Sequence, residues 1–413
     1  MTRVLVAAGV VASVLAVPSP AGALDSVLCE SVGDDVVTTS DPSLPLDRLG
    51  IPDAQALVGG IARSGAGVNV AVLDSGVSRQ GGGVPVVGGT AISRGGEIQD
   101  PHGTAVAALI AGAPRPDSAG GPVGVAPAAG ILDVRVYDTT DEASLDGEPP
   151  SSAALAAGLR WVAAHASADG IRIANVSMSV APSGELASAV AAVRAAGVVV
   201  VAETGNRGAT GPMEAHPSAV PGEDVAKDVY PAGYDGVVGV NATGGGAPEG
   251  TDPLVNVAAS SATDVAAPTY GSVVLAVNGS TCTLQDISSG WAAAEVSGVL
   301  ALLWSRYPKD TADEVVARLV NTASGTTDDP TKLTGAGVVQ PLEALTRPLV
   351  PGADGRVSDT RSARDENPRA RAPEPEVDTL ASLRHTALWT AILGGAALVL
   401  ALMLRPVLAR RRD

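Results

Sequence analysis

Aromatic residues are scarce in this chain: its 413 residues include no Phe, and Phe, Trp and Tyr together account for 2%. This scarcity argues against an aromatic-rich binding module. A core can still form from Ala, Val, Leu and Ile, because 46% of the residues are hydrophobic. That content excludes an intrinsically disordered chain, and the length allows one large core or two ordinary domains.

Positive charge and metal-binding residues are also scarce. Lys and Arg number 27 against 44 Asp and Glu, which gives a net charge of −17. A surface of this sign repels a polyanion, so a nucleic-acid partner is not expected. The 4 His and 2 Cys form no metal-binding motif, and the sequence contains neither a phosphate-binding glycine loop nor a calcium loop. We therefore expect no cofactor and no metal.

The N-terminus has the pattern of a secretory signal peptide over residues 1–23. Arg3 provides a short positive region, residues 4–17 are apolar, and residues 21–23 (Ala-Gly-Ala) form a small-residue cleavage site. An N-terminal membrane anchor is the alternative, but two prolines interrupt a run that is already short. We expect an exported mature chain that begins near Leu24.

A second apolar run lies near the C-terminus. Residues 387–404 contain no charged side chain, and at 1.5 Å per residue they reach about 27 Å, close to the thickness of the hydrocarbon core. The arginines that follow should stay in the cytoplasm. We therefore expect a single-pass transmembrane helix over 386–404, a short cytoplasmic tail over 405–413, and an extracytoplasmic domain before them. A buried core helix is the alternative, although such a helix rarely ends a chain with an Arg cluster behind it.

Cys29 and Cys282 are the two cysteines of the chain. In an exported protein a lone pair suggests one disulfide, which here would close a loop of about 250 residues and contribute about 5 kcal/mol in the chain-entropy model. Two unpaired thiols are the alternative, but free exposed thiols are a liability outside the cell. We expect the disulfide.

Between residues 24 and 347, apolar strands alternate with Ala-rich helical stretches. Residues 68–73 form a near-continuous apolar run, typical of a strand covered on both faces, and residues 152–166 carry apolar side chains along one helical face. Further strands are expected at 131–136, 171–176 and 198–202, and further helices at 105–111 and 185–196. The alternation predicts an α/β domain with a mostly parallel sheet and helices on both faces. Residues 348–385, rich in Pro and charge, predict a flexible stalk.

Three short motifs place reactive side chains at element ends. Asp74 ends the first predicted strand within Asp-Ser-Gly, His102 opens an apolar helix within His-Gly-Thr, and Asn206 follows a Val-rich strand within Thr-Gly-Asn. Ligands bind at the carboxyl ends of strands in open α/β sheets, which makes this edge the candidate site.

In this order the motifs resemble those of the subtilisin-like serine peptidases, over about residues 45–345. With the signal peptide, stalk and membrane helix added, the chain is similar to the mycosins, the membrane-anchored subtilases of actinobacterial type VII secretion systems. The resemblance implies that Asp74 orients the imidazole, that His102 is the general base, and that Asn206 donates to the oxyanion.

The fourth motif of the family is altered. The family has Gly-Thr-Ser before a helix that continues through a Pro, whereas this chain reads Ser-Ser-Gly at 288–290 and has Ala294 at the Pro position. Gly290 then takes the place of the nucleophile, and glycine cannot form an acyl-enzyme. A one-residue slip would offer Ser289, or Ser288, instead, but a helix turns by about 100° per residue, so the slip would re-aim the hydroxyl.

Two further positions bear on activity. The strand that should pair with substrate reads Ser-Met-Ser-Val at 177–180, where the family favours Ser-Leu-Gly. Glu203, close to Asn206, is either a solvated carboxylate or a modifier of the site. Together with Gly290, these departures indicate that more than one part of the catalytic apparatus has changed.

Three hypotheses follow. The first is a non-catalytic subtilase homologue that acts as a membrane-tethered structural or peptide-binding component of the type VII secretion membrane complex. The second is an active serine endopeptidase with a displaced nucleophile such as Ser289, acting on a polypeptide substrate. The third is a free-standing peptide receptor unrelated to secretion.

Overall fold

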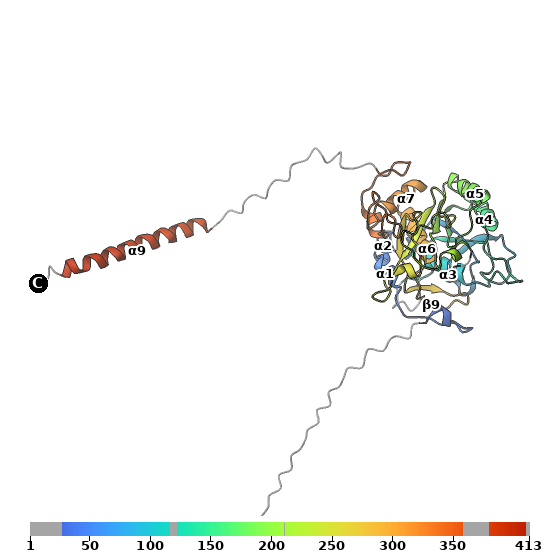
Figure 1. The fold of residues 1–413 in the computed structure, drawn as a ribbon, viewed down its shortest axis with the longest axis horizontal. Helices are drawn as coiled ribbons and strands as arrows, with labels where there is room; N and C mark the ends of the chain where they lie inside the picture. The colour runs from blue at the N-terminus through green and yellow to red at the C-terminus, as the bar shows by residue number, and fades with distance from the viewer. Residues whose placement is uncertain (1–26, 116–121, 210, 358–379, 410–413) are drawn as a thin grey trace, which may run out of the picture. The chain divides into compact units, whose positions relative to one another are not determined.

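The computed structural model describes residues 27–115, 122–209, 211–357 and 380–409. The chain divides into two compact units, Met1–Ser358 and Asp359–Asp413 (Figure 1). The expected signal peptide and residues 358–379 of the expected stalk lie outside the described residues and stay predictions.

A seven-stranded parallel sheet forms the centre of the first unit, in the order β2-β3-β1-β4-β5-β6-β7. Runs of Val, Ile, Leu and Ala, buried on both faces, form its central strands. The strands are β1 (Asn69–Asp74), β2 (Val86–Ala91), β3 (Gly130–Arg135), β4 (Ile171–Val176), β5 (Val199–Glu203), β6 (Val238–Thr243) and β7 (Val265–Pro268). A separate antiparallel pair consists of β8 (Ser272–Leu275) and β9 (Thr281–Leu284). The predicted, mostly parallel sheet is confirmed.

Helices cover both faces of the sheet. Because side chains alternate along a strand, Val70 and Val72 of β1 pack into one core and Ala71 and Leu73 into the other. The first core contains α1 (Leu44–Arg48), α2 (Ile51–Leu57), α3 (His102–Ala111), α6 (Ser289–Arg306), α7 (Ala312–Val320) and α8 (Pro341–Thr346); the second contains α4 (Ser152–His165) and α5 (Gly184–Ala195). Helices α4 and α5 lie side by side, and α6 runs through the middle of the unit (Figure 1).

The elements that sequence periodicity predicted lie within about three residues of their expected bounds. Strands β2 and β6 to β9 were not anticipated, and neither were the short 3-10 helices. These are η1 (Cys29–Ser31), η2 (Ile61–Arg63), η3 (Gln80–Gly82), η4 (Gly211–Ala215) and η5 (Pro253–Val255).

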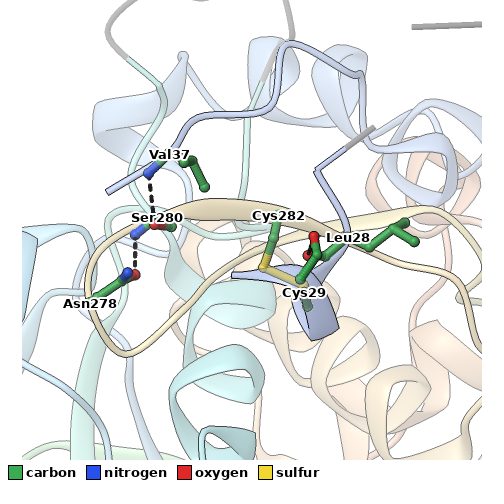
Figure 2. The surroundings of a disulfide bond; sticks show 7 residues. Leu28, Cys29, Val37, Asn278, Ser280 and Cys282 are labelled. Atoms are coloured by element: carbon green, nitrogen blue, oxygen red, sulfur yellow. Dashed lines mark hydrogen bonds between the residues drawn. A yellow bond between two sulfur atoms is a disulfide. The ribbon is translucent and has the colours of Figure 1, made fainter. Parts of the chain in front are cut away.

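The first described segment of the chain is fastened to β9 by a disulfide and by hydrogen bonds. Cys29 and Cys282 are joined with their Cα atoms 4.9 Å apart, as expected (Figure 2). Val37 N donates to Ser280 Oγ at 2.9 Å, and Thr281 N donates to Val37 O at 2.9 Å. The segment therefore continues the β8–β9 pair as an extra edge.

The second unit contains one long helix, α9 (Ala381–Ala409). Its stretch Ser382–Arg405 has a mean hydropathy of 2.2 and is long and apolar enough to cross a membrane. It includes the whole of the segment 386–404 expected from the sequence.

Removing the disulfide should destabilise the first unit without abolishing its fold. The bond joins residues 253 positions apart, so its loss frees the unfolded chain, while the hydrogen bonds of Val37 remain. We expect the double variant Cys29→Ala, Cys282→Ala to lose about 2–5 kcal/mol of unfolding free energy. The measurement is urea denaturation of the full-length protein in detergent.

Reductant provides the matched control. It should lower the unfolding free energy of the unmodified protein to that of the double variant, and it should leave the unfolding free energy of the variant unchanged. Identical denaturation midpoints for the oxidised protein and the double variant would contradict a stabilising role.

Candidate active site

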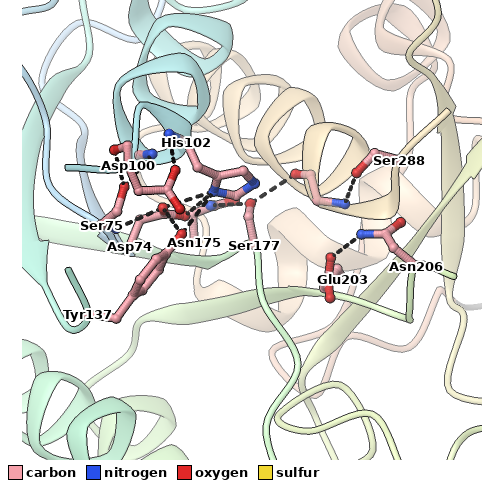
Figure 3. A network of polar contacts seen from close by, with 12 residues as sticks. Asp74, Ser75, Asp100, His102, Tyr137, Asn175, Ser177, Glu203, Asn206 and Ser288 are labelled. Carbon is pink, nitrogen blue, oxygen red and sulfur yellow. Dashed lines mark hydrogen bonds and ion pairs between the residues drawn. The ribbon is translucent and has the colours of Figure 1, made fainter. Parts of the chain in front are cut away.

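Asp74 and His102 meet at the carboxyl edge of the sheet. Asp74 is the last residue of β1 and is fully buried, and His102 is the first residue of α3. His102 Nδ1 lies 2.9 Å from Asp74 Oδ1 and 3.1 Å from Oδ2 (Figure 3). The carboxylate also accepts from Ser75 N at 2.8 Å and from Tyr137 Oη at 3.1 Å. These donors fix the carboxylate against the imidazole.

The His-Gly-Thr motif holds the start of α3 against the end of β1. A Cβ on Gly103 would lie 2.6 Å from Gly76 O, so only glycine allows this approach. Gly103 N donates to Ser75 Oγ at 2.9 Å, and Thr104 Oγ1 accepts from Ser78 N at 2.9 Å. Small and hydroxyl-bearing residues thus position the histidine.

Competing effects set the protonation of His102. Burial lowers the pKa of its imidazole, but the attraction and hydrogen bond of Asp74, helped by Asp100 and Glu203, outweigh burial and raise that pKa from 6.5 to about 9. The side chain is 26% exposed, so solvent screens part of this attraction. Its ring packs against that of Trp291, with centroids 4.6 Å apart. The Asp74 carboxylate thus favours the protonated form of the imidazole.

Asn206 lies just beyond β5, and its amide has a defined orientation. Its Oδ1 accepts from the backbone N of Ser289 at 2.7 Å, a group that can only donate, so Nδ2 must point the other way. Nδ2 donates to Glu203 Oε2 at 2.6 Å (Figure 3). The amide expected to donate to an oxyanion therefore already donates to a carboxyl oxygen.

Gly290 is the second residue of α6 and lies between β4 and β5. Its carbonyl accepts from Ser177 Oγ at 2.9 Å, and its N donates to the helix-capping Ser288 Oγ at 3.3 Å. A Cβ built on Gly290 would lie 3.2 Å from Glu203 Oε2 and 3.4 Å from Ser177 Cβ. The residue that the motif comparison aligned with the nucleophile thus borders the carboxylate that Asn206 holds.

The two alternative serines have other partners. Ser289 is fully buried, and its hydroxyl donates to Asn206 Oδ1 at 2.9 Å. Ser288 caps α6. Within the described part of the chain, no hydroxyl forms a hydrogen bond with His102 Nε2; the nearest contact, Tyr137 Oη, lies 3.5 Å from Nδ1.

Glu203 is not the solvated carboxylate that the sequence left open, because it is 3% exposed. Burial raises the pKa of its carboxyl, while the hydrogen bond from Ser179 and the attraction of His102 act in the opposite direction. Ser179 Oγ donates to Oε1 at 2.9 Å. Tyr137 and Trp291 also belong to the site and were missed, although Tyr137 follows a predicted strand and Trp291 directly follows Gly290.

A cleft of about 530 Å³ opens in front of these residues. The segment 177–180, expected from the sequence to be a strand that pairs with substrate, follows the end of β4 and lines the cleft, and so do Asp100, Glu142 and Glu203. His102 is the one basic side chain among the lining residues that the structure describes. The cleft is therefore acidic apart from the imidazole. Across the described residues, no group of three or more His, Cys, Asp or Glu side chains could hold a metal ion.

The chain is similar to known subtilases. The subtilase family model matches residues 65–341. Mycosin-1 of Mycobacterium tuberculosis (strain ATCC 25618 / H37Rv) is 33% identical over 345 residues, which cover 76% of this chain and 75% of that protein.

Two solved structures are similar. The crystal structure of MycP1 with the N-terminal propeptide removed has a TM-score of 0.61 at 27% identity, covering 76% of this chain and 100% of that one. The MycP3 protease from the type VII (ESX-3) secretion system has a TM-score of 0.59 at 27% identity, covering 78% of this chain and 91% of that one.

The pair of Asp74 and His102 makes a titration prediction. We expect His102 to titrate near pH 9 and Asp74→Asn to lower its pKa below 6.5, because burial then acts without its main opponent. A folded-state pKa above 6.5 also means that the pair stabilises the fold fully below pH 6.5 and loses this contribution as pH rises through 9. Histidine NMR of the full-length protein in detergent measures the titration; the chain has only 4 His, so single variants assign the signals.

Asp228→Asn, which removes the 3.0 Å partner of His216, is the control and should leave the His102 titration unchanged. A His102 titration at or below pH 6.5 in the unmodified protein would contradict the assignment.

Proposed function

The chain belongs to the subtilase family, and from that premise we propose that it is a mycosin-type subtilase homologue that no longer hydrolyses peptide bonds. In this role it is a membrane-tethered structural or peptide-binding component of a type VII secretion system. Gly290, at the position aligned with the nucleophile, is the observation that carries the proposal.

The chemical argument rests on the missing hydroxyl. Acyl transfer by this family requires an oxygen nucleophile beside the imidazole, and glycine offers none. In subtilisin, a member of the same family, loss of the nucleophile lowers kcat by about 10⁶, or about 8 kcal/mol of barrier. The Ser288 hydroxyl caps α6, and the Ser289 hydroxyl donates to Asn206. These contacts support the loss of activity rather than a displaced nucleophile.

The cleft favours peptide binding. It has a volume of about 530 Å³, the segment 177–180 lines it, and neither needs a nucleophile to hold an extended peptide. The cleft's carboxylates favour a peptide with basic side chains.

The relatives and helix α9 support the proposed location and partners. Mycosin-1 matches three quarters of this chain, and the similar MycP3 protease comes from a type VII (ESX-3) secretion system. Helix α9 would anchor the chain, with its trailing arginines in the cytoplasm and the first unit outside. Subunits of the secretion membrane complex are then the proposed partners.

The alternative is an active peptidase that uses Ser289 as its nucleophile. An active-site probe distinguishes this alternative from the proposed inactive homologue. We expect a serine-directed fluorophosphonate to leave the unmodified full-length protein unlabelled, because no hydroxyl is activated by His102. Intact-mass spectrometry gives the stoichiometry. The variant Gly290→Ser should label weakly, since it restores an oxygen beside the imidazole.

Ser289→Ala in the Gly290→Ser background is the control, and its labelling should persist. Stoichiometric labelling of the unmodified protein at Ser288 or Ser289 would contradict the proposal and establish the peptidase.

A further inference from the structure

Glu203 is an unusual side chain to find at the end of a buried strand. Strand β5 is otherwise Val-Val-Val-Ala, and the carboxyl group that follows is 3% exposed. Within the described residues, no Lys or Arg forms an ion pair with it. Its partners are instead the Ser179 hydroxyl at 2.9 Å, the Asn206 amide at 2.6 Å and, more distantly, the Ser289 hydroxyl at 3.4 Å. Burial of a carboxyl group is costly unless it is held in this way.

The carboxyl group lies where a side chain at position 290 would begin. A Cβ on Gly290 would be 3.2 Å from Glu203 Oε2, closer than most real Cβ contacts. On its other side that Cβ would meet Ser177 Cβ and Ser177 O, each at 3.4 Å, so the space cannot open in that direction without moving the backbone. Glycine at 290 and glutamate at 203 therefore fit each other.

The same oxygen holds the amide of Asn206. Because Ser289 N fixes the other end of that amide, Nδ2 cannot turn away from Glu203 without losing the 2.7 Å bond at Oδ1. An oxyanion that approached Nδ2 would meet the carboxylate oxygen 2.6 Å from it. The two oxygens would then share the two N–H groups of a single nitrogen, and an ionised Glu203 carboxylate would repel the oxyanion.

We propose that Glu203 blocks the oxyanion side of the site, because its carboxylate holds the Asn206 donor and fills the space beside residue 290. This inference rests on the proposed loss of activity and deepens it: the site carries a second lesion in addition to the absent hydroxyl. Restoring a serine at 290 then gives a nucleophile beside an amide donor that Glu203 already engages. Removal of Glu203 frees both the donor and the space.

Phosphonylation by a fluorophosphonate tests the inference directly. In that step the serine Oγ forms a bond to phosphorus, fluoride leaves, and the hydroxyl proton passes to His102 Nε2. The phosphoryl oxygen gains negative charge and needs the donor that Glu203 holds. The rate of labelling thus measures how available the Asn206 amide is to the phosphoryl oxygen, provided that His102 is deprotonated.

The experiment compares labelling rates of full-length variants in detergent across pH. Rates are compared on the plateau above the His102 titration, because removal of the Glu203 charge also eases deprotonation of His102. We expect Gly290→Ser with Glu203→Ala to label about 100-fold faster than Gly290→Ser alone, the effect of one oxyanion donor. Glu203→Ala alone should stay unlabelled.

Two matched variants complete the design. Glu185→Ala in the Gly290→Ser background removes an exposed carboxylate of α5 outside the cleft and should give no acceleration. Glu203→Ser, in the same Gly290→Ser background, leaves Ser179 a hydroxyl partner and serves as a second replacement in case the alanine variant misfolds. It should accelerate labelling similarly. Thermal denaturation checks the fold of each variant.

Equal plateau rates for Gly290→Ser with and without Glu203 would overturn the inference, and so would a failure of both folded Glu203 replacements to accelerate labelling. Labelling of the unmodified protein would instead overturn the proposed loss of activity, so the two failures are distinguishable.

Discussion

Helix α6 packs its first turns against the carboxyl ends of β4 and β5, and this contact sets the geometry of the whole site. Three hydrogen bonds define it: Ser177 Oγ to Gly290 O, Ser289 N to Asn206 Oδ1, and Ser297 Oγ to Asn175 Oδ1. The helix is buried along nearly its full length, so its position cannot adjust to a new side chain without disturbing the core. The space beside position 290 is consequently fixed, and one group can occupy it.

The two sides of the site differ in how closely they match the pattern expected of the family. On the side of β1 and α3, the carboxylate–imidazole pair keeps its geometry, with hydroxyl and backbone donors around Asp74. On the side of β5 and α6, glycine stands at 290 and the buried carboxyl group of Glu203 accepts from the Asn206 amide (Figure 3). The first half also packs α3 against the sheet through Gly103, so its motif serves the fold whether or not catalysis takes place. Under the proposed loss of activity, this structural role would account for the presence of Asp74 and His102.

The sequence predicted the first half well, because Asp74 and His102 lie at element ends that parallel topology brings to one edge. It also predicted the disulfide, from compartment and cysteine count. Burial of Glu203 could not be predicted, since it depends on how closely α6 approaches β5 and on the absence of a side chain at 290. Tyr137 reaches Asp74 because β3 pairs with β1, a strand order that periodicity does not specify. The expected signal peptide and residues 358–379 of the expected stalk lie outside the described residues.

The most direct test of the central claim is a search for turnover itself. The full-length protein in detergent is incubated with a diverse peptide library, and mass spectrometry records every new peptide terminus, with His102→Ala as the background. If His102 activates no hydroxyl, the unmodified protein and His102→Ala give the same termini. A peptide cut at a defined bond by the unmodified protein, and left intact by His102→Ala, would contradict the central claim.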